Sequence, residues 1–244
     1  MKAVMYHYVR EPNPDLPHFI FLDVENFRKQ IRHFLDRFRI LSLADIEHAL
    51  ETGNPPPDSM VLTFDDGLAD HYDYVYPVLK EFGVSGLFYV PTGPYEQEQL
   101  LDVHRTHYLL GRFGGKSVLA ALRRTLRPED LLPGAEERFA AVTYTGQKNS
   151  EAVREAKRLI NYRIDPRRRT PLLTRLMLDF GIDEQALAKS YYLSPEQMQE
   201  MAAAGMGIGS HAKSHTVLSN LDAQEQHGEI HDSFALLQSL TGGR

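Results

Sequence analysis

The first ninety residues alternate between short apolar runs and longer amphipathic stretches. The apolar runs predict four β-strands, at residues 2–6, 39–42, 60–65 and 86–90. Between them, apolar residues recur at helical spacing and predict helices over 24–38, 43–50 and 70–82. A regular alternation of strands and helices predicts a parallel sheet, either open or closed into a barrel.

This alternation stops after residue 93. The following hundred residues are helical and charged in pattern, without a strand, and predict helices over 101–112, 117–126, 151–162 and 171–180. The pattern indicates a helical insertion at residues 94–191.

The alternation returns at Ser194. Ser194 and Gln197 flank a proline at the first helical position, a pattern typical of a helix start with a capping box. We expect a fifth strand at 206–210 and a last helix over 222–240, with Asp222 and Glu225 spaced for another capping box. Residues 1–93 and 192–244 are therefore the expected two parts of one α/β domain. Five strands are fewer than the roughly eight of a closed (β/α) barrel, so we expect either a small complete sheet or a truncated one.

The main candidate for chemistry lies at the end of the third predicted strand, where Phe64 is followed by Asp65, Asp66 and Gly67. The carboxyl ends of strands are the positions at which α/β barrels place their active sites. Two adjacent carboxylates repel each other, so a nearby cation is needed to keep both ionised at neutral pH. His211 and His215 follow the fifth predicted strand, about 145 residues later, and complete a candidate metal site.

Asp66, His211 and His215 form a set of three protein ligands, the arrangement expected of a hydrolytic metal site that keeps room for water. The chain has no cysteine, so only oxygen and nitrogen ligands are present. A divalent ion lowers the pKa of water and polarises a carbonyl oxygen, and Asp65 is placed to act as the general base. Such a site suits hydrolysis of an amide or an ester. His7 follows the first strand and is a candidate to line the same end of the sheet.

Each of these residues also has a structural interpretation. An Asp-Asp-Gly sequence is common in turns and at helix N-caps. His227 and His231 have the same spacing as the candidate ligands, but we expect them, with Glu225, Glu229 and Asp232, on a solvated helix face. His104 and His107 are expected to be surface or packing residues.

Composition adds few constraints. The 244 residues are 42% hydrophobic and 25% charged, with a net charge of -6, which implies no general attraction to nucleic acid or to an anionic membrane. The basic runs Arg123-Arg124 and 167–169 are expected to be solvated surface.

No apolar stretch reaches transmembrane length, and the first residues lack the apolar region of a signal peptide, so a cytoplasmic protein is expected. The sequence indicates no particular oligomeric state.

Residues 63–67 and 210–218 together resemble the two main motifs of the polysaccharide deacetylase family, the NodB-like carbohydrate esterases. The resemblance covers about residues 1–93 and 192–240 and also includes Tyr6-His7 and Thr92-Gly93. It implies a distorted (β/α) barrel and a reaction that removes acetyl groups from sugars. By the family pattern, Asp65 corresponds to the base and Asp66, His211 and His215 to the ligands of a zinc or another divalent ion, whose bound water attacks the acetyl carbonyl. His7 and Ser214, which occupies a hydroxyl position of the second motif, are expected to line the substrate.

The chain departs from the family pattern in two ways. Ala212 and Thr216 stand where the family often has a hydroxyl residue and a proline. The third motif of the family, which supplies an oxyanion-hole N–H, and a later histidine that protonates the leaving amine are expected beyond Gly243. We therefore expect the N-terminal portion of a longer deacetylase acting on an N-acetylated sugar or glycan precursor. The alternatives are hydrolysis of a non-sugar amide or ester at the same site, and a non-catalytic glycan-binding or truncated deacetylase-like protein.

Overall fold

The computed structural model describes residues 1–133, 143–144, 146 and 148–242. It contains two compact units. The first comprises residues 1–11, 21–99 and 188–244, and the second comprises residues 12–20 and 100–187. The expected insertion at 94–191 includes residues 134–142, 145 and 147, which lie outside the described residues.

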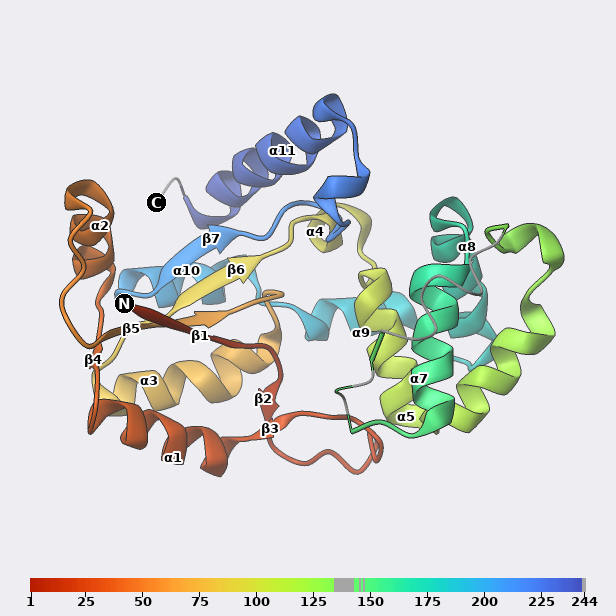
Figure 1. Cartoon of the computed structure of the whole chain (residues 1–244), viewed down its shortest axis with the longest axis horizontal. Helices are drawn as coiled ribbons and strands as arrows, with labels where there is room; N and C mark the ends of the chain where they lie inside the picture. The colour runs from red at the N-terminus through yellow and green to blue at the C-terminus, as the bar shows by residue number, and fades with distance from the viewer. Residues whose placement is uncertain (134–142, 145, 147, 243–244) are drawn as a thin grey trace. The chain divides into compact units, whose positions relative to one another are not determined.

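The first unit contains a five-stranded parallel sheet (Figure 1). Its strands are β1 (Lys2–Tyr6), β4 (Arg39–Ile40), β5 (Ser59–Phe64), β6 (Leu87–Val90) and β7 (Gly207–Ser210). Met60 pairs with both Lys2 and Ile40, so β1 and β4 lie on opposite sides of β5. The remaining pairs are β5 with β6 and β6 with β7, and every pairing is parallel. The predicted α/β class is confirmed, and in the described residues the pairing runs as a path from β1 to β7.

Two further strands were not predicted. β2 (Val9–Arg10) pairs in parallel with β3 (Leu22–Asp23). Each strand has only two residues, too few to show an alternating pattern in the sequence.

The helices of the first unit cover the sheet. They are α1 (Val24–Leu35), α2 (Leu43–Thr52), η1 (His71–Val75), α3 (Tyr76–Phe82), α4 (Gly93–Gln97), α10 (Pro195–Ala203), η4 (Leu218–Asn220) and α11 (Ala223–Thr241). Figure 1 shows α1 and α3 below the sheet and α11 above it, and both α10 and α11 contact β7. The two predicted capping boxes, Ser194 with Gln197 and Asp222 with Glu225, are confirmed by their hydrogen bonds. The helix predicted over 70–82 begins with the π-helical turn η1.

Three aromatic rings stack across the middle of the sheet, directly before the Asp65-Asp66 pair. Tyr6, Phe64 and Phe88 occupy the same level of β1, β5 and β6, and the Phe64 ring lies 5.4 Å from Tyr6 and 4.7 Å from Phe88. Phe27 of α1 meets both Tyr6 and Phe64 edge-on. All four rings are buried, so they form a rigid base for the strand end that follows.

The second unit is helical in its described residues. It contains α5 (Asp102–Thr125), η2 (Pro128–Asp130), α7 (Glu151–Arg158), η3 (Leu159–Arg163), α8 (Pro166–Asp179) and the first residues of α9 (Glu184–Tyr191). The two helices predicted over 101–112 and 117–126 are confirmed, because α5 consists of two helical parts that meet at Gly114, whose φ of 74° and ψ of 158° are not helical. α8 begins five residues before the predicted start because Asp165 caps it. None of the described helices is long and apolar enough to span a membrane.

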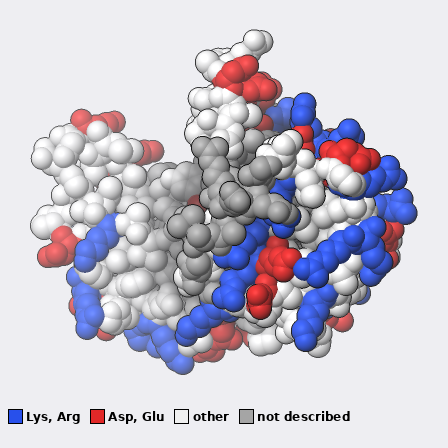
Figure 2. Space-filling view, turned by 45° about the vertical axis from the view of Figure 1, so that its right-hand side comes forward, with Lys and Arg blue, Asp and Glu red and all other residues white. Residues whose placement is uncertain are grey.

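Acidic and basic side chains are interspersed on the face of the protein shown in Figure 2. Arg123 pairs with Glu155, and Arg167 pairs with Asp165. Both arginines are exposed, as expected for the basic runs of the sequence.

A buried ion network joins the outgoing and returning segments of the second unit. The Arg105 side chain is 1% exposed and pairs with Glu184 at 2.6 Å and with Asp102 at 2.9 Å. Glu184 also accepts a hydrogen bond from the N–H of Leu100, and Asp102 accepts one from Thr170. The network thus links the start of α5 to α8 and to the start of α9.

Glu184→Gln is expected to lower the free energy of unfolding by about 2 kcal/mol, because it removes one of the two carboxylates that the described residues place on the buried guanidinium of Arg105. Urea unfolding followed by circular dichroism measures the change. Asp179→Asn, which breaks the exposed Arg175–Asp179 pair of α8, is the control and should change stability by less than about 0.5 kcal/mol. Equal effects of the two substitutions would contradict the assigned role of Arg105.

Candidate active site

The Asp65-Asp66 pair forms a tight turn at the carboxyl end of β5. The Asp65 N–H donates to the carbonyl of Tyr6, which continues the β1–β5 pairing by one residue. Asp66 and Gly67 then adopt φ values of 80° and 58°. A Cβ atom at Gly67 would lie 2.9 Å from Cγ1 of Val90, so the turn requires glycine to pack against β6. This geometry turns the chain sharply and leaves Asp66 buried at 3% exposure.

Three of the predicted site residues lie together. Oδ1 of Asp66 is 3.3 Å from Nε2 of His215 and 3.6 Å from Nε2 of His211. The two imidazole rings are 5.0 Å apart, and one ligand atom from each of the three residues lies within 4.8 Å of the others. Among the residues that the structure describes, no other group of three His, Asp or Glu side chains meets that distance.

The chemistry of this donor set fits a divalent metal ion. One carboxylate oxygen and two imidazole nitrogens are typical zinc ligands, and three of them leave a coordination position for substrate or water. Burial lowers the pKa of His211, which favours the neutral, metal-binding form of its ring. The hydrogen bond with Asp66 raises the pKa of His215.

Asp65 lies beside this group and is half-buried. Burial raises the pKa of Asp65, while the neighbouring imidazoles of His211 and His7 lower it. A carboxylate with these neighbours is placed to exchange a proton near the candidate metal position.

His7 lies at the same end of the sheet, with Nε2 3.9 Å from Oδ2 of Asp66 and its side chain 39% exposed. Its carbonyl oxygen is 2.9 Å from Nε2 of His71, a fully buried ring that contacts Phe64 and Phe88. Sequence reasoning missed His71, because nothing in the predicted helix distinguishes it from a packing residue.

A second buried group, also missed, lies next to Asp66. The hydroxyls of Tyr8 and Tyr191 are 3.1 Å apart, and Arg10 forms two hydrogen bonds of 2.8 Å with Asp70. Burial raises the pKa of both tyrosines, and the nearby charge of Asp66 raises them further. Tyr191 is the last residue of α9, so the segment that returns to the first unit contributes to the surroundings of the site.

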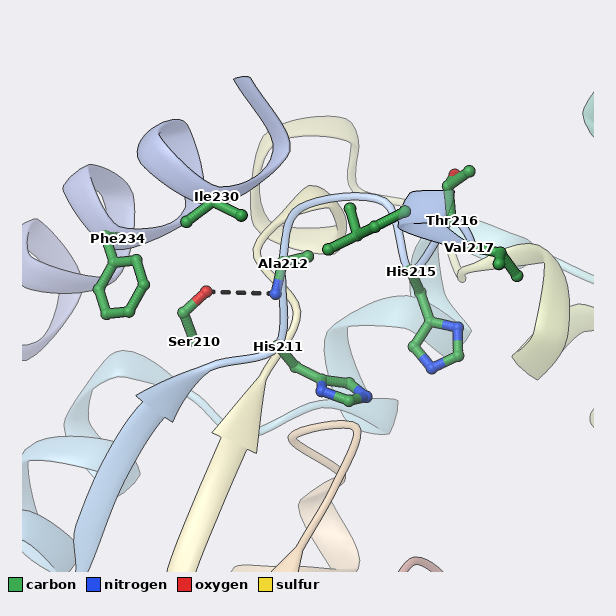
Figure 3. Close-up of a pocket in the computed structure, with 9 residues that line it drawn as sticks. Ser210, His211, Ala212, His215, Thr216, Val217, Ile230 and Phe234 are labelled. Carbon is green, nitrogen blue, oxygen red and sulfur yellow. Dashed lines mark hydrogen bonds between the residues drawn. The ribbon is translucent and has the colours of Figure 1, made fainter. Parts of the chain in front are cut away.

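The loop from His211 to His215 follows β7 and directs both rings to one side (Figure 3). Ala212 and His215 have φ values of 58° and 59°, a region that residues other than glycine seldom adopt. The hydroxyl of Ser214 donates to Glu229 at 2.6 Å and lies 2.7 Å from Thr216 Oγ1. Glu229 is therefore a partner of the loop and not a solvated helix residue, which corrects the expectation from the sequence.

A pocket of about 400 Å³ borders the two histidines. His211 and His215 line one part of it, and its apolar lining includes Val217, which directly precedes η4, and Ile230 and Phe234 of α11 (Figure 3). The other pair with the same spacing, His227 and His231, lies exposed on α11 with its rings stacked 5.3 Å apart. His104 is fully buried in the second unit, away from any described metal-ligand group.

Residues 52–122 and 174–244 match the family model of polysaccharide deacetylases. The chain belongs to the polysaccharide deacetylase family, a family of hydrolases. A comparison with curated proteins found no match.

The fold is similar to that of solved deacetylases. The Streptococcus pyogenes deacetylase PplD, determined in complex with acetate, superposes with a TM-score of 0.55 at 17% identity, over 99% of this chain and 69% of that protein. A polysaccharide deacetylase from Bacillus cereus has a TM-score of 0.48 at 14% identity, over 98% of this chain and 47% of that protein. IcaB from Ammonifex degensii has a TM-score of 0.46 at 15% identity, over 98% of this chain and 69% of that protein. The match to PplD supports the α/β fold, and this chain spans about half to two thirds of these three proteins.

Proposed function

We propose that this chain is a metal-dependent deacetylase that removes an acetyl group from an N-acetylated sugar or glycan precursor. The observation that supports the proposal is the convergence of Asp66, His211 and His215 from two distant segments, with Asp65 beside them. The family match supplies the reaction class and a glycan as substrate.

Each residue has a specific role in this proposal. Asp66, His211 and His215 hold a divalent ion, and nitrogen and oxygen ligands in a three-residue set favour zinc. Such an ion, when bound, polarises a carbonyl oxygen and makes water more acidic. Asp65 accepts the proton of the attacking water as general base. His7, which is partly exposed at the same strand ends, and Ser214 are proposed to face the substrate.

Acetate is the product expected of deacetylation, and it is the molecule bound in the PplD structure that shares this fold. The helical segment at 94–191 is proposed as an insertion into the deacetylase fold. Residues 123–173, which the family match leaves out, lie inside that segment.

The apolar residues that line the pocket favour a second candidate function. Val217, Ile230 and Phe234 offer no hydrogen-bonding side chain to a sugar, whereas they suit an apolar group of a non-sugar amide or ester. The proposed metal site would be the same in both functions.

Hydrolysis by the zinc-loaded protein, measured as acetate release from acetylated sugars and as ring opening of cyclic amides, tests the proposal and separates the two candidates. We expect release from N-acetylglucosamine oligomers and little hydrolysis of small cyclic amides, because the family acts on glycans. Preferential hydrolysis of the cyclic amides would support the second function. A metal-loaded protein that releases acetate from no acetylated sugar and cleaves no amide would overturn both.

A further inference from the structure

The loop that contains His211 and His215 is held from two sides. On one side, the turn between β6 and α4 donates two backbone hydrogen bonds, from Thr92 to the carbonyl of Ala212 at 3.2 Å and from Gly93 to that of Lys213 at 2.8 Å. A Cβ atom at Gly93 would lie 2.7 Å from the same Lys213 oxygen, so this approach needs glycine. The carbonyl groups of the loop are thus bound by the neighbouring strand end.

On the other side, α11 binds the loop through Glu229. Its Oε2 accepts hydrogen bonds from the N–H groups of Lys213 at 3.0 Å and Ser214 at 2.8 Å, and its Oε1 accepts one from the Ser214 hydroxyl at 2.6 Å. One carboxylate therefore satisfies three donors of a five-residue loop. Hydrogen bonds to an ionised acceptor are stronger than those between neutral groups.

Ser233 lies one turn further along α11 and completes the contact. Its hydroxyl donates to the Ala212 carbonyl at 2.8 Å and lies 2.6 Å from the Ser210 hydroxyl. Ser233 is fully buried, so these bonds are shielded from water.

The loop needs such support because its backbone is unfavourable by itself. Ala212 and His215 both have a left-handed conformation, which L-residues other than asparagine and aspartate seldom adopt. The His215 backbone conformation directs its ring towards Asp66, and Ala212 immediately follows His211. The contacts with Glu229 and Ser233 of α11 therefore support a backbone conformation that is unfavourable by itself.

We propose that Glu229, assisted by Ser233, is a positioning residue that sets the separation of His211 and His215 before a metal ion binds. The inference rests on the proposed metal site. Glu229 is not one of the candidate ligands, and both of its carboxylate oxygens accept hydrogen bonds from the loop. Substitution of residues that orient metal ligands in this way commonly lowers the affinity for the metal, although these residues do not contact the ion.

The test is the affinity of the purified chain for zinc, measured by competition with a chromophoric chelator. Glu229→Ala is expected to weaken zinc binding about 10–100-fold, the range typical of lost outer-shell partners. Glu229→Gln keeps one carbonyl oxygen as an acceptor and should show a smaller loss. The absorption spectrum of the cobalt-substituted protein should also change in Glu229→Ala, since it reports the geometry of the ligands.

Glu225→Gln is the matched control. This substitution removes the same charge from α11. Because glutamine can replace glutamate in the capping box with Asp222, the helix start is kept. The zinc affinity of the Glu225→Gln variant should therefore equal that of the wild type. The melting temperature of each metal-free variant shows whether it is folded, and Glu229→Gln replaces Glu229→Ala if the latter does not fold.

The outcomes separate this inference from the proposed function. A wild type that binds no zinc overturns both. The role of Glu229 alone is overturned by a different result. In that case the wild type binds zinc, the zinc affinities of Glu229→Ala and Glu229→Gln equal that of Glu225→Gln, and the cobalt spectrum is unchanged.

Discussion

His211→Ala is expected to abolish stoichiometric metal binding while leaving the chain folded. The substitution removes one of three candidate ligands, whose Nε2 lies 3.6 Å from Oδ1 of Asp66. The loss of affinity should exceed the roughly 10–100-fold that follows from the loss of an outer-shell partner. Elemental analysis after dialysis should give about one zinc per wild-type chain and almost none for the variant.

His227→Ala is the control for this experiment. His227 and His231 have the same spacing as His211 and His215, but they lie exposed on α11 and do not belong to the group of three metal-ligating side chains found among the described residues. The control should retain all the metal. If both variants lost metal equally, zinc would be bound by exposed imidazoles in general, and the proposed site would be wrong.

Asp65→Asn is expected to separate metal binding from catalysis. Asp65 is not one of the three candidate ligands, so zinc content should remain at the wild-type level. An asparagine side chain cannot accept the proton of the attacking water, and loss of a general base typically costs about 10²–10⁴-fold in rate. The rate of acetate release under substrate saturation measures the effect, with elemental analysis of the same sample.

Asp73→Asn is a suitable control, because Asp73 is an aspartate of η1 whose pKa is also raised by desolvation. It should leave both the metal content and the rate unchanged. A fully active Asp65→Asn would exclude Asp65 as the base, and a metal-free Asp65→Asn would instead assign it to the ligand set.

Local features of this protein can be predicted from its sequence more accurately than contacts between distant segments. The capping boxes of Ser194 and Asp222 were predicted correctly because each depends on residues three positions apart. The five strands of the sheet were predicted for a similar reason, since a short apolar run reveals a buried strand. The short strands β2 and β3 and the contacts of Glu229 with the loop were missed, because they depend on tertiary contacts.

The residues 12–20 illustrate a long-range contact that no local pattern reveals. They belong to the second compact unit, although the helices of that unit begin about ninety residues later. The N–H of His18 donates to the carbonyl of Gly111, and a Cβ atom at Gly111 would lie 2.3 Å from the Phe19 ring. Packing of this kind depends on which segments become neighbours in the folded chain.

The sequence by itself determined the order of the elements, the parallel α/β class and the identity of the residues proposed for the site. These follow from periodicity, turn residues and two short motifs, all of which act over a few positions. The sequence also predicted that Asp66 meets His211 and His215. Only the tertiary structure decided the distances among these three, the binding of their loop by Glu229, and the positions of His71 and the Tyr8–Tyr191 pair next to the site. Those contacts join residues 15 to 183 positions apart, and their geometry depends on strand order and helix packing rather than on local preference.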